Sequence, residues 1–305
     1  MRIPVLLLLI SQLLLAEPRF AEPDHIRVPL WIDSGEALEA GALTATVGGQ
    51  PAGVVRVQGP DDDLMVLVIL DLTEDLNEIE MARNGLADAI DEAPSNAYIG
   101  VMRAQSGLRV LQDPSSEREA AIEAVRSFPI SGTPGLLETI EEAADLADSL
   151  IRDTGVRIAI FYVTDSEIDS YREDFTNPVV NRSDRGDMSR RFPEGLVRDR
   201  ISRLDTKLAS SQAPIFVVHL KYETDRIDEA YQNGILQMAT TTGGDAVFCR
   251  SDAEIAAAIG SMMERIATHY SVDLEVPRQA ADTVEIALES QTGGELVYRS
   301  RYNIR

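Results

Sequence analysis

The middle of the chain alternates continuous apolar runs with helical periodicity. Strands buried on both faces are expected at 65–70, 158–163 and 215–218, and shorter strands at 98–102, 108–111 and 246–248. Helices are expected at 76–92, 115–127, 134–151, 195–210, 226–240 and 252–268. This βαβ alternation predicts an α/β fold, a doubly wound and mostly parallel sheet with helices on both faces.

The two ends of the chain show a different pattern. Residues 26–58 contain short strand-like pieces separated by glycine and proline turns, and the segment after residue 270 alternates apolar and polar positions. We therefore expect a small β module assembled from both ends, residues 26–60 and 270–305. The α/β domain between them is expected to span residues 61–269.

The first residues predict a targeting segment. Met1-Arg2 is followed by an almost wholly apolar run, residues 3–16, which is short for a membrane span. We expect a signal peptide over residues 1–21, cleaved after Ala16 or Ala21, and an exported protein that is periplasmic or secreted. An uncleaved anchor is the alternative.

Composition narrows the choice of partner. The chain has 305 residues, 44% of them hydrophobic, which is enough for a packed core. Its net charge of -23 argues against binding nucleic acid or an anionic membrane surface, since both need clustered basic residues. Cys249 is the only cysteine, so no disulfide forms within the chain, and its apolar surroundings predict a buried, inert thiol.

Candidate chemistry gathers where the predicted strands end. Open α/β sheets bind ligands beyond the carboxyl ends of their strands. Asp71, Thr73 and Asp75 follow the first buried strand, Thr133 lies in a later loop, and Asp165 follows another buried strand. Oxygen ligands suit hard divalent cations, Mg²⁺ above all, with Ca²⁺ and Mn²⁺ as alternatives. For each residue taken alone, the competing interpretation is an ordinary helix N-cap.

This set of residues resembles the metal site of the von Willebrand factor A domain family, closest to the secreted bacterial VWFA-related subgroup. The family pattern is Asp-x-Ser-x-Ser, then a loop Thr, then a later Asp. Here the matching positions are Asp71, Thr73, Asp75, Thr133 and Asp165. The resemblance implies a metal-ion-dependent adhesion site and a protein partner that offers a carboxylate to the metal. It also implies that Thr73, Asp75 and Thr133 lie closest to the ion, with Asp71 and Asp165 acting through water.

The sequence departs from that pattern in its charge. Asp75 replaces a serine, Ser166-Glu167 follows Asp165 where the family often has glycine, and Glu74 is close by. The extra carboxylates should help to hold a cation but reduce its attraction for an anionic partner. Three outcomes stay open: a tightly held metal with weak recruitment, an Asp75 that points away as a cap, and a metal-free, vestigial site in a structural or scaffold protein.

Two further features bear on function. A long polar insertion, residues 166–194, should overhang the site, either as a binding lid or as a flexible insertion.

A secreted hydrolase is the less favoured alternative. Chemistry of the haloacid dehalogenase type needs a second Asp where Thr73 stands and a lysine at the site, whereas Lys207 and Lys221 are expected elsewhere. With no Gly-x-Ser-x-Gly elbow, phosphate loop or His-Glu-x-x-His helix in the sequence, we expect no enzyme.

Overall fold

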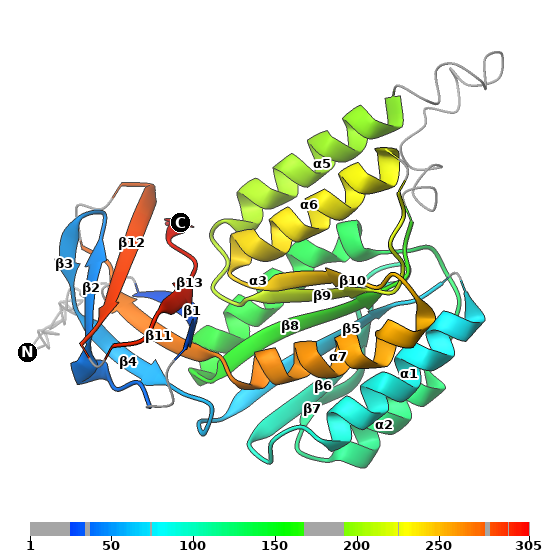
Figure 1. Cartoon of the computed structure of the whole chain (residues 1–305), viewed down its shortest axis with the longest axis horizontal. Coiled ribbons are helices and arrows are strands. Elements are labelled where there is room, and N and C mark those ends of the chain that lie inside the picture. Colours follow the sequence, from blue (N-terminus) through cyan, green and yellow to red (C-terminus); the bar gives the residue numbers. More distant parts are fainter. Residues whose placement is uncertain are drawn as a thin grey trace, which may run out of the picture.

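The computed structural model describes most of the chain (Figure 1). It covers residues 25–33, 37–73, 75–167, 192–224, 226–277, 281–291 and 293–304. The expected signal peptide, Glu74 and residues 168–191 of the insertion lie outside these ranges.

A six-stranded sheet forms the centre, in the order β10-β9-β8-β5-β6-β7. Its strands are β5 (Leu64–Asp71), β6 (Ala97–Arg103), β7 (Arg109–Ser115), β8 (Arg157–Thr164), β9 (Ile215–His219) and β10 (Asp245–Phe248). All neighbours are parallel except β6 and β7. Those two are joined by a tight turn in which Ser106 and Gly107 have positive φ, so the chain reverses at once instead of crossing over through a helix.

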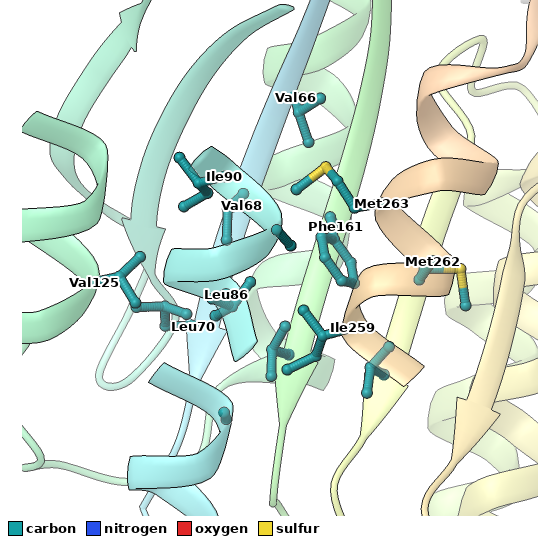
Figure 2. Close-up of a cluster of buried hydrophobic side chains, with 14 of the residues drawn as sticks. Val66, Val68, Leu70, Leu86, Ile90, Val125, Phe161, Ile259, Met262 and Met263 are labelled. Carbon is teal, nitrogen blue, oxygen red and sulfur yellow. The ribbon is translucent and has the colours of Figure 1, made fainter. Parts of the chain in front are cut away.

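Helices cover both faces of this sheet. One face carries α1 (Leu76–Asp91), α2 (Arg118–Ser127) and α7 (Asp252–Ala267), and the other carries α3 (Leu136–Thr154), α5 (Phe192–Leu208) and α6 (Arg226–Thr242). Alternate residues of β5 point to opposite faces, as the pleat of a strand requires. Val66 and Val68 join the α1–α7 cluster, in which Phe161 and Ile259 meet (Figure 2), whereas Leu67 packs on the α3 side. The doubly wound α/β prediction is confirmed.

The expected β module is also present, assembled from both ends of the chain. Its strands are β1 (His25–Ile32), β2 (Leu43–Val47), β3 (Gln50–Ala52), β4 (Val54–Gln58), β11 (Tyr270–Glu275), β12 (Thr283–Ser290), β13 (Leu296–Tyr298) and β14 (Arg301–Asn303), with a 3-10 turn at Ala40–Ala42. They form two four-stranded sheets, β13-β1-β11-β4 and β14-β12-β2-β3. Val28, Leu30, Val272 and Ile286 lie in the core between them.

The β module attaches to the amino-terminal edge of the central sheet (Figure 1). The wholly buried guanidinium of Arg157, the first residue of β8, donates to the carbonyls of Asp62 and His269 at 2.6 Å each, and to those of Pro60 and Ala267. Burial lowers the pKa of Arg157 to about 10. The module therefore lies opposite the carboxyl edge, where ligands are expected.

Two smaller observations concern the thiol and the helices. Cys249 is buried and free, and burial raises the pKa of its thiol to about 11, as an inert core cysteine requires. Within the ranges described above, the helices lack the length and apolarity needed to cross a bilayer.

Candidate functional site

Asp71 ends β5 and is fully buried beneath the start of α3. Its carboxylate accepts hydrogen bonds from the backbone N–H groups of Gly135 (2.8 Å) and Leu136 (3.1 Å) and from the Thr164 hydroxyl (3.1 Å). The first amides of a helix are short of partners and favour an anion, and Gly135, the N-cap of α3, has no side chain to serve them. Burial nevertheless raises the pKa of Asp71 to about 6, because desolvation outweighs these hydrogen bonds.

Asp165 fixes the turn that follows β5. It is buried directly after β8, and both of its carboxylate oxygens accept from the backbone N–H of Thr73, at 2.8 and 3.0 Å. Parallel pairing of β5 with β8 places Asp71 opposite Thr164, so the carboxyl ends of these strands meet. The structure therefore brings Asp71, Thr73 and Asp165 to one edge of the sheet, as the topology predicted.

Two buried oxygens near this turn lack a protein partner. The Thr73 hydroxyl and Gln105 Oε1 are inaccessible to solvent and accept or donate no hydrogen bond within the described residues. Unpaired buried polar atoms are uncommon and often mark a missing water or ion. This is the feature of the site that most clearly suits a bound cation.

The remaining predicted residues are placed differently. Asp75 is exposed and is the N-cap of α1, where its Oδ1 accepts from the N–H groups of Asn77 (2.7 Å) and Glu78 (3.4 Å). Thr133 is exposed in the loop before α3, and its carbonyl accepts from the Ser106 N–H at 3.3 Å. The role of Asp75 as a cap is thus real, whether or not its second oxygen also meets a cation.

Carboxylates alone do not form a metal centre here. In the part of the chain that the structure describes, no three Asp, Glu, His or Cys side chains are grouped so that they could hold an ion. A cation at this edge would have to draw on hydroxyl oxygens and water in addition to Asp71 and Asp165. Such a mixed oxygen set, with several waters retained, fits Mg²⁺ or Mn²⁺ better than a metal that requires nitrogen or sulfur ligands.

A hydrogen-bonded chain leads from Asp71 to α6. Thr164 Oγ1 donates to Asp71, Ser166 Oγ lies 2.7 Å from Thr164 Oγ1, and the Tyr231 hydroxyl lies 2.9 Å from Ser166 Oγ. Because a carboxylate only accepts, each hydroxyl must donate toward Asp71. No pattern in the sequence predicted this chain, although its middle member, Ser166, lies directly beside Asp165.

His219, at the end of β9, supports the same segment. Its Nδ1 accepts from the Lys221 N–H (3.3 Å), so Nε2 carries the proton and donates to the Ser166 carbonyl at 2.9 Å. Burial lowers the pKa of His219 and keeps the ring neutral. The backbone beside Asp165 is therefore held by a fixed donor.

The expectation that Lys221 lies away from this edge is wrong. Lys221 follows β9, whose carboxyl end is part of the same edge, and its ammonium contacts Glu167 Oε1 and Glu223 Oε1 at 2.6 Å each. These two carboxylates raise its pKa. Lys221 thus offsets the charge of Glu167, which the sequence had suggested would add to the acidity of the site.

Comparisons with known proteins concern the fold. A scan of protein-family models and a search of curated proteins found no match. The chain is similar to a solved von Willebrand factor type A protein from Catenulispora acidiphila, with 13% identity and a TM-score of 0.46, over 92% of this chain and 74% of that one. It is also similar to the ArnB paralog VWA2 from Sulfolobus acidocaldarius, with 10% identity and a TM-score of 0.44, over 91% and 76%.

A third similar structure is proximal thread matrix protein 1 from the mussel byssus, described with a zinc-occupied MIDAS motif. It shares 10% identity and a TM-score of 0.46, over 71% of this chain and 48% of that one. Of these three proteins, the first two are described as von Willebrand factor type A or VWA proteins, the family that the sequence resembles.

Proposed function

We propose that this von Willebrand A-like chain is an exported protein-binding domain that holds a divalent cation at the carboxyl edge of its central sheet. One observation carries the proposal. Among the described residues, the Thr73 hydroxyl is buried without a hydrogen-bond partner, in a turn whose backbone N–H contacts the buried Asp165, and a cation would supply the missing partner. Export rests on the signal-peptide pattern of residues 1–21.

The site residues divide into direct and supporting roles. In this proposal Thr73 offers its hydroxyl, and Thr133 offers a second one from the exposed loop before α3. Asp71 and Asp165 already accept backbone N–H groups, so they suit contact with the cation through water. Asp75 keeps α1 in place as its cap and adds negative charge at the rim.

A cation held mainly by neutral oxygens and water keeps an open position for a partner carboxylate. The pairing of Lys221 with Glu167 removes one source of repulsion at the rim. An acidic side chain of another protein is therefore the ligand we propose. In this account the β module, at the opposite edge, plays no part in capture.

Isothermal titration with Mg²⁺, Mn²⁺ and Ca²⁺ tests the cation, using wild type, Thr133→Ala and Ser131→Ala. Thr133 and Ser131 are both exposed in one loop, so neither change should disturb the fold. We expect wild type and Ser131→Ala to bind alike and Thr133→Ala to bind several-fold more weakly. If wild type shows neither binding heat nor a thermal shift with any of the three ions, the proposal is refuted.

A metal-free scaffold is the rival that the structure also favours in one respect, because no three acidic or imidazole side chains converge among the described residues. In that case the hydrogen bonds of Asp71 to the start of α3 are its whole role. Partner capture that is the same with Mg²⁺ and with EDTA, and unchanged in Thr133→Ala, would support this rival.

A further inference from the structure

Gln105 is a wholly buried amide that the site as described leaves unexplained. It lies just beyond the end of β6, at the same edge of the sheet as Asp71. Its Nε2 donates to the carbonyl of Leu72 at 3.0 Å, in the turn that carries Thr73. On its other side, a Cβ added at Gly132, in the loop that carries Thr133, would lie 3.2 Å from Gln105 Cβ. Gln105 therefore lies between the two loops of the candidate site.

The orientation of this amide follows from its neighbours. A carbonyl oxygen can only accept, so the nitrogen of the amide must face Leu72 and the oxygen must face away from it. Gln105 Oε1 is then a buried acceptor without a donor among the residues described, the same condition as the Thr73 hydroxyl. A buried acceptor without a donor is unfavourable for the folded state, and a ligand at this position would relieve that cost.

We propose that Gln105 Oε1 is a further oxygen of the cation site, contacting the ion directly or through one water. The inference rests on the proposed function and extends its ligand set to a residue outside the five identified from the sequence. An amide oxygen adds a contact without adding charge. In a site that already has Asp71, Asp75 and Asp165, it strengthens cation binding while leaving the ion able to attract an anionic partner.

The competing role is structural, since the bond to Leu72 alone could hold the turn. Gln232 in α6 provides a matched control. It is also a buried glutamine that pairs with backbone, but both of its amide atoms are occupied: Nε2 donates to the Glu223 carbonyl (2.8 Å) and Oε1 accepts from the Glu223 N–H (3.3 Å). Replacing either glutamine by methionine keeps the volume and removes the amide.

The experiment combines Mn²⁺ and Mg²⁺ titration calorimetry with Tm in EDTA for wild type, Gln105→Met and Gln232→Met. Both variants should lower Tm in EDTA, because each removes a backbone partner. Only Gln105→Met should weaken cation binding, by about tenfold or more in Kd. If Gln105→Met does not fold, Gln105→Asn, which keeps the amide but withdraws it by one methylene, should show the same weakening.

The outcomes separate this inference from the proposed function. If wild type binds the cation and Gln105→Met binds it equally well, the inference is overturned and the proposed function stands. A wild type that binds no cation would overturn both.

Discussion

Replacing Thr73 by valine should have opposite effects on stability with and without the cation. Valine has the shape of threonine but lacks the hydroxyl, so the change removes one buried atom that has no partner in the described structure. Such an unpaired hydroxyl costs about 1–3 kcal/mol, and we expect Thr73→Val to raise the free energy of unfolding by about 1 kcal/mol in EDTA.

With the cation present, Thr73→Val should lose its advantage in stability over wild type. A ligand at one hundred times its Kd stabilises the folded protein by about 2.7 kcal/mol, and a site weakened tenfold gives about 1.4 kcal/mol at the same concentration. The gain from removing the hydroxyl is then cancelled or reversed. Urea unfolding of wild type and Thr73→Val, each in EDTA and in Mn²⁺, measures the difference in stability under both conditions.

Thr242→Val is the control. Thr242, the last residue of α6, is buried beside the start of β9, where its hydroxyl donates to the Ala239 carbonyl (2.7 Å) and accepts from the Ile215 N–H (2.9 Å). Its replacement should cost about 1–2 kcal/mol in both buffers. A Thr73→Val protein that is less stable than wild type in EDTA, or that keeps the full gain from Mn²⁺, would refute the reasoning.

Three other predictions concern the start of α3 and the junction between the central sheet and the β module. Gly135→Ala should destabilise the protein by roughly 3 kcal/mol or more, because the added Cβ would lie 2.0 Å from the Ala104 carbonyl oxygen. Gly41→Ala is the control, because a Cβ there would have nothing within 4 Å. Urea unfolding compares the two variants, and equal stability would contradict this prediction. Burial lowers the pKa of His269 to about 3. Between about pH 6.5 and pH 3 the unfolded chain therefore binds a proton at His269 that the folded chain does not bind, and the free energy of unfolding should fall by about 2 kcal/mol at pH 5. His269→Gln should remove that part of the slope and the exposed His25→Gln should not; equal slopes would count against it. Arg157→Met should cost about 3 kcal/mol or more in chemical denaturation, because it leaves several buried carbonyls unpaired, and a near-neutral result would refute that role.

The sequence predicted the layers of the fold because their signal is local. A run such as residues 65–70 has no polar position, as a strand buried on both faces requires. The same rule located Asp71 and Asp165, since parallel strands bring their carboxyl ends to one edge. The direction of β7 was not predictable in this way, because a tight turn at Ser106 and Gly107 replaces the usual helix.

What the sequence could not give is the direction of each polar side chain. Asp75 fits a ligand pattern and an N-cap equally well, and only its bonds to Asn77 and Glu78 show that it is a cap. Lys221 looked remote because its partner Glu167 is far from it in sequence. Gln105 follows a strand at the same edge as Asp71, yet its importance appears only when the unpaired oxygen is seen beside the Leu72 turn.

The most direct test of the cation site is a crystal structure with excess Mn²⁺ and an anomalous difference map. We expect a peak at the carboxyl edge of β5 and β8, where the Thr73 hydroxyl, Asp71 and Asp165 would hold the ion directly or through water. A map in which the Thr73 hydroxyl instead meets a water or a protein group, with no peak at this edge, would contradict it.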